Sequence, residues 1–440
     1  MDSRARRVRV GQVLAIALLL AAVVAYLWRF AVGHGFFDLK VYFGAIRYWA
    51  GGHGEIYDFL KPGTRYGFTY PPFAALAMLP MAVLPWPVVF TLSWIASAAV
   101  TLAVFAWLLT PLARRHGWAR WFVLVVAMIL AAGLEPVHET VSFGQVNMLL
   151  LFLVVADFVL LIWPGRRWRG QRLGGVGVGL ATAVKLTPGI FVLYLLLARR
   201  YRAAAVACAT FAGATLLAMA VAPNASLEYW SSAVFDTDRV GDLSYVSNQS
   251  WQGLVARLDP GNPSTALWAL LVLATLAVWG WRARQAVRAR DELGGLALTG
   301  VLGCLISPIT WVHHLVWLLP ALVLLVDRGL RAAGRRRVRL LAFAVVLYAA
   351  LASEVEWYFL NHFRGWGLLG GNLYVIASVA LLLGLPVGAR GRAVPQLGEV
   401  DRAGAGALDG EQGAPVRARV EGEAVPLVEA PRPKVGLEHP

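Results

Sequence analysis

Long apolar segments alternate with short arginine-rich segments along most of the chain. A helix needs about 20 apolar residues to cross the hydrocarbon core of a bilayer. Single spans are therefore predicted at about 11–32, 86–109, 119–134, 147–163, 203–222, 264–281, 293–306, 315–327, 338–352 and 371–388. The apolar stretch 173–198 has arginines at both ends and Lys185-Leu186-Thr187-Pro188 at its middle, which predicts two short helices joined by a turn. The pattern indicates an all-α, polytopic membrane protein with about twelve transmembrane helices.

The basic residues predict on which side of the membrane each loop lies. Arginines cluster in residues 1–10 and again between alternate spans, and cytoplasmic loops are enriched in Lys and Arg. This places both termini in the cytoplasm and makes 33–71 the first outer loop. Pro71-Pro72 at its end predicts a short helix over 72–84, because proline is tolerated in the first helical turn.

Composition supports the membrane class. Of 440 residues, 59% are hydrophobic and 15% charged, whereas soluble domains have roughly 45–50% and about 25%. The net charge of +15 comes largely from arginines in short runs between apolar segments. It does not form a basic face with interleaved aromatics, so we expect no nucleic-acid binding. Cys208 and Cys304 form no Cys-x-x-Cys pair, which argues against a structural zinc site or a disulfide framework.

The last 52 residues differ from the rest. The stretch 389–440 is rich in Gly, Pro, Ala and charged residues, and such a composition cannot bury a core. We predict a cytoplasmic N-terminus over 1–10, a membrane domain over 11–388 and a disordered cytoplasmic tail over 389–440.

Unusual polar residues gather on the predicted outer side. Six of the eight histidines fall there, together with one acidic residue and four amides: His34, His53, His138, His313, His314, His362, Asp38, Gln145, Asn147, Asn248 and Gln249. Polar and ionisable groups within a membrane protein are costly and usually functional. The distribution predicts an active or binding site on the outer side.

Two charged residues have competing interpretations. Asp38 follows the first span, where an aspartate can cap a helix or act as a general base. Lys185 can extend its ammonium toward the membrane surface or bind an anion. Its positive charge lies on the outer side, against the topological bias, and a phosphate facing the ammonium would explain that cost.

The remaining candidates are neutral or weakly basic. Gln145 and Asn147 lie in a turn between two spans, where they cap the following helix or bind sugar hydroxyls through amides that both donate and accept. Tyr70 lies in a predicted turn at the interface. His313 and His314 would point about 100° apart on a helix, so only one is expected to face a small site. A metal site would need further ligands, and we expect none.

Six short motifs, in order along the chain, resemble glycosyltransferase family 87. They are Asp38-Leu39-x-Val41-Tyr42, Phe68-Thr69-Tyr70-Pro71-Pro72-Phe73, Gly144-Gln145-Val146-Asn147, Lys185-Leu186-Thr187-Pro188, Asn248-Gln249-Ser250 and Ser307-Pro308-x-x-Trp311-x-His313-His314. The resemblance covers about 11–388. It implies a GT-C-type fold and a mannosyltransferase that uses a polyprenyl-phosphate mannose donor.

The resemblance also implies partners and roles. The acceptor would be a glycan or glycolipid on the outer face of the plasma membrane, the product an α-1,2 linkage, and no metal or other cofactor would be needed. The family's catalytic acid maps onto Asp38, and its histidine motif, expected to contact the donor phosphate, maps onto His313 or His314.

General chemistry is consistent with these roles. One inversion of a β-linked sugar phosphate gives an α-glycoside, and a carboxylate can take the proton of the acceptor hydroxyl. The phosphate leaving group needs cations, which Lys185, a histidine and Arg239 can supply. Candidate sugar- or acceptor-binding residues are Tyr42, Tyr70, Gln145, Asn147, Asn248, Gln249 and Trp311.

Two alternatives stay open at this stage. A polyprenyl-phosphate arabinofuranose transferase of the same fold would carry similar motifs. A twelve-helix secondary transporter would also be polytopic, but transporters of this kind often show two related halves with polar sites at the midplane. No matching halves are apparent in this sequence.

Overall fold

The computed structural model describes residues 3–30, 33–162, 173–236, 239, 241–360 and 362–388. Apart from one antiparallel bridge between Leu60 and Gly67, the regular structure in this part of the chain is helical, which confirms the all-α prediction. The predicted tail, 389–440, lies outside the described residues.

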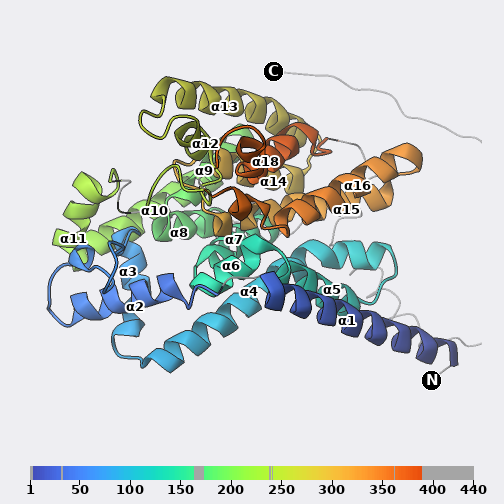
Figure 1. The fold of residues 1–440 in the computed structure, drawn as a ribbon, viewed down its shortest axis with the longest axis horizontal. Helices are drawn as coiled ribbons and strands as arrows, with labels where there is room; N and C mark the ends of the chain where they lie inside the picture. Colours follow the sequence, from blue (N-terminus) through green and yellow to red (C-terminus); the bar gives the residue numbers. More distant parts are fainter. Residues whose placement is uncertain are drawn as a thin grey trace, which may run out of the picture. The chain divides into compact units, whose positions relative to one another are not determined.

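In this described part of the chain, eighteen α-helices and several short 3₁₀ or π segments follow one another; Figure 1 shows their arrangement. The α-helices are α1 Ser3–Phe30, α2 Phe37–Ala50, α3 Pro72–Met78, α4 Trp86–Arg115, α5 Arg120–Ala132, α6 Glu135–Phe143, α7 Asn147–Ala156, α8 Val176–Val184, α9 Ile190–Leu197, α10 Tyr201–Val221, α11 Pro223–Glu228, α12 Trp251–Leu258, α13 Thr265–Arg288, α14 Glu292–Ile306, α15 Leu319–Arg331, α16 Gly334–Leu351, α17 Trp366–Gly370 and α18 Leu373–Gly384. The 3₁₀ segments include η1 Ile56–Asp58, η2 Leu79–Ala82, η5 Thr187–Gly189, η8 Val312–Leu318 and η9 Val355–Phe359.

The predicted apolar segments fall on helices, but few of these are long. Within the described ranges, five helices are long and apolar enough to cross a membrane: Arg7–Arg29, Trp86–Arg115, Tyr201–Val221, Thr265–Arg288 and Val312–Arg331. A sixth arises if α5 and α6, which bend by 74° at their junction, form one span. The fold is thus that of a multi-pass membrane protein with five or six such helices, and the number twelve stays a prediction.

Prolines and polar residues break the shorter helices where the sequence predicts. Pro72 opens α3 as its first residue. The stretch 173–198 contains α8 and α9 with a turn between them, as predicted. The break is at Lys185, whose backbone is extended (φ −152°) and which precedes the 3₁₀ turn at Pro188. The side chain of Lys185 therefore emerges from a break between two helices.

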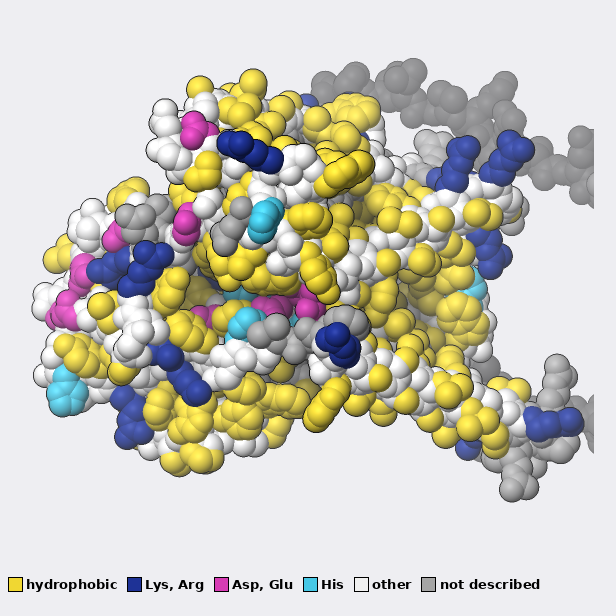
Figure 2. All heavy atoms as spheres, viewed as in Figure 1, with side chains coloured by type: hydrophobic (Ala, Val, Ile, Leu, Met, Phe, Trp, Pro, Cys, Tyr) yellow, Lys and Arg dark blue, Asp and Glu magenta, His cyan; other side chains and the backbone are white. Residues whose placement is uncertain are grey.

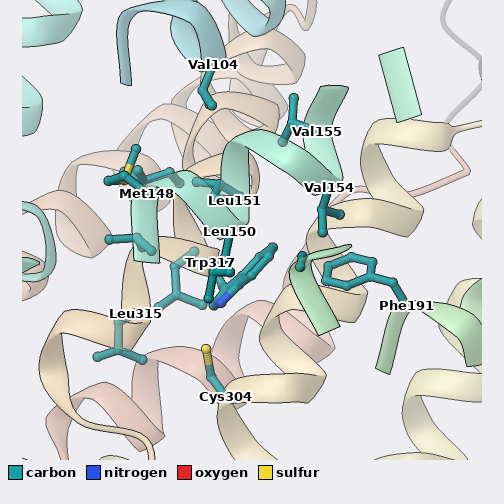
Figure 3. Packing of buried hydrophobic residues seen from close by; sticks show 14 of the residues in the cluster. Val104, Met148, Leu150, Leu151, Val154, Val155, Phe191, Cys304, Leu315 and Trp317 are labelled. Atoms are coloured by element: carbon teal, nitrogen blue, oxygen red, sulfur yellow. The ribbon is translucent and has the colours of Figure 1, made fainter. Parts of the chain in front are cut away.

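The buried centre is formed where α7 meets α4, α8 and η8, and where α14 meets α9 and η8. Figure 3 shows Leu150, Leu151 and Val154 of α7 within this packing, with Phe191 and Trp317 nearby; the rings of Phe191 and Trp317 lie 5.2 Å apart. In a membrane, close van der Waals packing of this kind is what holds helices together. It fixes η8 and the start of α7, which carry site residues.

The candidate spans differ in how far neighbouring helices cover them. Only 6% of the Arg7–Arg29 window is buried and 22% of the Trp86–Arg115 window, against 78% of Val312–Arg331. Figure 2 shows the resulting apolar surface in yellow. Exposed leucines and tryptophans on α1 and α4, such as Leu18 and Trp94, suit contact with lipid, whereas η8 and α15 contact protein.

Candidate active site

Asp38 lies in the first turn of α2 and does not cap it. The capping position is Phe36, which has a left-handed backbone (φ 57°) and no side-chain capping bond. The Oδ2 atom of Asp38 instead accepts a hydrogen bond of 2.7 Å from Nε2 of Gln145. The interpretation of Asp38 as a simple helix cap is therefore wrong, and its carboxylate belongs to a tertiary cluster.

A glycine at the end of α6 brings Gln145 to this carboxylate. Gly144 has φ +71°, which favours glycine, and a Cβ atom there would lie 2.5 Å from Cβ of Leu39. The backbone N–H of Phe36 also donates to the Ser142 carbonyl at 2.9 Å. The start of α2 and the end of α6 thus approach each other closely, with Asp38 and Gln145 at the junction.

Two tyrosines extend the cluster. Tyr70 donates from its hydroxyl to Oε1 of Gln145 at 2.6 Å, and the Tyr42 hydroxyl lies 2.9 Å from that of Tyr70. Tyr57 donates to the Tyr70 carbonyl at 2.8 Å. Because Gln145 accepts from Tyr70 through its oxygen, its NH₂ group faces Asp38, so the network leaves the Asp38 carboxylate as an acceptor.

Lys185 lies at the other end of this cluster. Its Nζ atom is 2.7 Å from Nε2 of His314, 3.3 Å from Oδ1 of Asn147 and 5.2 Å from the centre of the Tyr70 ring. Among the described residues Lys185 has no carboxylate within ion-pair distance. Lys185 therefore has no internal counter-ion, and its charge, when it is protonated, is available to an external anion.

The two histidines occupy different environments. Their rings lie 4.7 Å apart at 85°, and only His314 contacts Lys185. Nδ1 of His314 accepts from the Trp311 backbone N–H at 3.1 Å, so the neutral ring carries its proton on Nε2. The backbone carbonyl of His313 accepts from Thr140 and Asn147, at 2.9 and 3.0 Å.

Burial moves the pKa values of both charged groups of the cluster, Asp38 and Lys185, toward 7. Burial raises the pKa of Asp38 to about 6, although the Gln145 hydrogen bond and the charge of Lys185 act in the opposite direction. Burial lowers the pKa of Lys185 to about 7, against the charge of Asp38. A carboxylate with a pKa near 6 is a stronger base than an ordinary aspartate and is still ionised at pH 7.

A pocket adjoins this cluster. Lys185, His314, Asn147 and Thr310 give it a polar wall, while Ile190, Phe191 and Trp317 give it an apolar one. The charged wall suits an anion, and the apolar wall suits a hydrocarbon group attached to it.

Four of the predicted site residues have other partners. Asn248 bonds to the carbonyls of Leu243 and Pro308 and to the Thr310 N–H. Gln249 bonds to the carbonyls of Val246 and Gly371. The Trp311 ring packs edge-to-face on Tyr245 at 6.0 Å. Arg239 lies 3.4 Å from Asp236, 3.7 Å from Glu228 and 3.2 Å from the Tyr57 carbonyl.

These contacts indicate that the four residues connect loop segments to one another. Asn248 and Gln249 fasten the segment before α12 to the segments that carry Pro308 and Gly371. Two carboxylates already neutralise the charge of Arg239. The structure joins none of the four to Asp38 or Lys185 by a hydrogen bond or ion pair among the residues that it describes.

Sequence reasoning missed Glu139. This residue of α6 is 4% exposed, and its Oε1 atom lies 2.8 Å from Nε2 of His34. The signal that could have found it is a glutamate in a short helix between two apolar segments. Across the ranges described, no group of three or more His, Cys, Asp or Glu side chains could hold a metal ion.

Comparison with known proteins gives a consistent set of relatives. Residues 68–308 match the sequence profile of glycosyltransferase family 87. A polyprenol-phosphate-mannose-dependent alpha-(1-2)-phosphatidylinositol pentamannoside mannosyltransferase of Mycolicibacterium smegmatis is 32% identical over 84% of this chain and 90% of its own length. A polyprenol-phosphate-mannose-dependent alpha-(1-2)-phosphatidylinositol mannoside mannosyltransferase of Mycobacterium tuberculosis is 33% identical over 85% of this chain and 90% of its own.

A third relative, from Mycolicibacterium smegmatis, carries the same description as the Mycobacterium tuberculosis protein. It is 37% identical over 65% of this chain and 68% of its own length. No solved structure matches the chain.

Proposed function

Because the chain belongs to glycosyltransferase family 87, we propose that it transfers mannose from a polyprenol-phosphate mannose donor to a phosphatidylinositol mannoside, forming an α-1,2 linkage. The chain is a glycosyltransferase, and the donor, acceptor and linkage follow from the descriptions of its relatives. The observation that carries the proposal is the cluster in which Gln145 and Tyr70 link Asp38 to the neighbourhood of Lys185 and His314.

Asp38 is the proposed general base. The acceptor hydroxyl attacks the anomeric carbon of mannose while its proton passes to the Asp38 carboxylate. The bond between that carbon and the phosphate oxygen breaks, and its electron pair leaves with the phosphate. One displacement inverts the configuration, so a β-linked donor gives an α-linked product. The donated hydrogen bond from Gln145 occupies Oδ2 and leaves Oδ1 for the proton.

Lys185 and His314 are the proposed phosphate-binding pair. The donor is a phosphodiester and leaves as a phosphomonoester, so negative charge grows on its oxygens during the reaction. Fixed donors placed where charge develops lower the barrier of such reactions. Nζ of Lys185 and Nε2 of His314 lie 2.7 Å apart and are hydrogen-bonded to each other, so both are close enough to contact one phosphate group when it binds.

Phosphate binding would also rearrange the pair. The Trp311 N–H places the His314 proton on Nε2, so in the absence of an anion Lys185 must accept that proton's hydrogen bond as a neutral amine. A bound phosphate favours the ammonium and accepts from both groups. This dependence makes Lys185 a cation that is most stable when the donor is present.

The neutral members of the cluster have a supporting role. Gln145 and Tyr70 hold Asp38 in position, Tyr42 supports Tyr70, and Asn147 orients Lys185. The pocket beside Lys185, with its polar and apolar walls, suits the phosphate and the first isoprene units of the donor. In the proposed topology about twelve helices span the plasma membrane and this cluster faces outward, while 389–440 forms a cytoplasmic tail.

The test is transfer by the purified full chain in lipid nanodiscs. Radiolabelled polyprenol-phosphate mannose is offered with phosphatidylinositol mannosides of increasing mannose number, and polyprenol-phosphate arabinofuranose is offered in parallel. We expect a labelled glycolipid from the mannose donor that an exo-acting α-1,2-mannosidase cleaves. Transfer from the arabinose donor alone, or a product resistant to that enzyme, would overturn the proposal.

A further inference from the structure

His34 and Glu139 form a pair next to the base. Oε1 of Glu139 lies 2.8 Å from Nε2 of His34, and the His34 ring stacks on Phe143 with centroids 3.9 Å apart. The side chain of Glu139 is 5% exposed and that of His34 is 23% exposed. The pair therefore has a buried carboxylate and an imidazole that reaches the surface four residues before Asp38.

This pair is not needed to fasten α2 to α6. The backbone N–H groups of His34 and Phe36 bond to Ser142 at 2.8 and 2.9 Å, and Gln145 bonds to Asp38. Gly144 packs directly against Leu39. The junction is thus secured by main-chain bonds, an amide and close packing, none of which involves the Glu139 carboxylate.

The negative charge of Glu139 argues against a role for this carboxylate in holding the donor phosphate. Burial is the largest cause of the raised pKa of Asp38, and the negative charge of Glu139 adds to it, while His34 acts in the opposite direction. A second carboxylate near the base would repel a phosphate. It would attract the hydroxyl protons of a neutral sugar, because an ionised carboxylate accepts and cannot donate.

We propose that Glu139 and His34 form the subsite for the acceptor sugar and hold a hydroxyl next to the one that reacts. This inference rests on the proposed function. Figure 2 shows acidic and histidine side chains gathered in a hollow at the centre of one face of the molecule. Glu139 accepts a hydrogen bond from the neighbouring sugar hydroxyl, His34 orients the carboxylate, and the attacking hydroxyl is left at Asp38.

Such a subsite would select which hydroxyl is glycosylated. A pyranose held at one hydroxyl by Glu139 can present only an adjacent hydroxyl to a base on the neighbouring helix. Both residues are positioning residues, since neither contacts the reacting atoms in this arrangement. Their loss should therefore weaken the use of the acceptor more than that of the donor.

The first experiment separates the two substrates. Glu139→Gln and His34→Gln are assayed in nanodiscs with an alkyl α-mannopyranoside as acceptor. Hydrogen bonds to charged groups are worth enough that the acceptor KM should rise about 10- to 100-fold in Glu139→Gln. The donor KM and the slow hydrolysis of the donor by water should change by less than about twofold, since donor binding is untouched.

The second experiment identifies the contact. Alkyl mannosides lacking the 3- or the 4-hydroxyl are compared with the parent acceptor. The intact enzyme should use the 3-deoxy analogue about tenfold or more less well, because the 3-hydroxyl is the free neighbour of the reacting 2-hydroxyl and a site built to bind a hydroxyl rejects the analogue without it; the 4-deoxy analogue should be used like the parent. Glu139→Gln should lose that discrimination. A variant that still discriminates fully would overturn the assignment.

A matched control comes from the same helix. His138 Nε2 lies 3.3 Å from Oε1 of Glu354, so Glu354→Gln alters another buried His–Glu pair. It should leave both KM values unchanged. If Glu139→Gln lowers the Tm and both KM values shift together, the pair is structural and the inference fails. If the intact enzyme transfers no mannose at all, the proposed function fails first. Should Glu139→Gln not fold, His34→Gln with the deoxy analogues decides the question.

Discussion

Two regions of the molecule hold buried charges in opposite ways. At the ends of α4, α14 and α15, each carboxylate contacts an arginine: Asp327 contacts Arg115 and Arg331, Glu292 contacts Arg200, and Asp291 lies 2.8 Å from Arg328. Around Asp38 and Lys185 the contacts are amides, a phenol and an imidazole. The first region neutralises its charges internally.

The difference distinguishes charges that stabilise the fold from charges that are available to a substrate. Paired charges satisfy each other and stabilise the packing of helix ends. The charges at Asp38 and Lys185 are close enough to influence each other's pKa but are kept from forming an ion pair. In the proposed reaction, the carboxylate accepts a proton from the acceptor hydroxyl, and the ammonium binds the donor phosphate.

The largest effect is expected at the base. Asp38→Asn should reduce transfer about 10²- to 10⁴-fold, the usual contribution of general base catalysis, because an amide cannot take the proton. Donor binding should stay within a few-fold of the wild-type value. Turnover and equilibrium binding of labelled donor, measured separately, check this. Full activity in this variant would remove Asp38 from the mechanism.

Lys185→Ala should fail in a different way. Loss of a charge-assisted contact with the phosphate should reduce kcat/KM about 10- to 100-fold and should weaken donor binding as well as turnover. The same two measurements distinguish it from Asp38→Asn. Unchanged donor affinity in Lys185→Ala would show that the phosphate binds elsewhere.

The pH dependence sharpens the contrast between the two groups. Asp38 acts when deprotonated, so kcat/KM should fall about tenfold per pH unit below its pKa of about 6. Lys185 acts when protonated, so kcat/KM should fall as pH rises above its pKa of about 7. The fall of kcat/KM at high pH should vanish in Lys185→Arg, because arginine stays protonated. A decrease of kcat/KM at high pH that persists in Lys185→Arg would show that another group titrates.

The paired region should affect stability without affecting chemistry. Asp327→Asn leaves Arg115 and Arg331 without their carboxylate. The free energy of unfolding should fall by an amount between the ~0–1 kcal/mol that an exposed ion pair contributes and the ~3–5 kcal/mol lost when a buried pair is broken. Thermal unfolding should occur at a lower temperature, while kcat per folded molecule stays constant. A fall in kcat without a change in Tm would show that the paired region also takes part in catalysis.

Removal of the tail should have the smallest effect. The composition of residues 395–440, which are rich in Gly, Pro, Ala and charged residues, is unsuited to a core. Deletion of 395–440 should leave transfer within a few-fold of that of the full chain. Transfer assays on matched amounts of both proteins test this, and complete loss in a well-expressed truncation would show that the tail takes part.

Much of the fold follows from the sequence because apolar length and helix-breaking residues act locally. The broken hairpin at Lys185 and the start of α3 at Pro72 are examples. Bilayer length alone does not say which apolar helices cross the membrane, since protein neighbours also cover short helices such as α7 and α14.

The site could be predicted only where a residue type is unusual in its surroundings. Asp38, Lys185 and Gln145 stand out as polar residues among apolar segments, and the structure joins them in one cluster. Asn248 and Gln249 stand out equally, yet their amides bond to loop carbonyls. The sequence does not distinguish an amide that binds the backbone from one that faces a substrate, because the partners are remote in the chain.

The deep burial of Val312–Arg331 has a consequence for the biogenesis of the protein. This segment contains Asp327, Arg328 and Arg331 and is covered by other helices over 78% of its apolar window. Bare lipid is a poor solvent for such a segment. It should enter the bilayer together with α4 and α14, which supply Arg115 and contact it. The ribosome makes both before it, so late synthesis of this segment lets the translocon release it into a prepared protein environment.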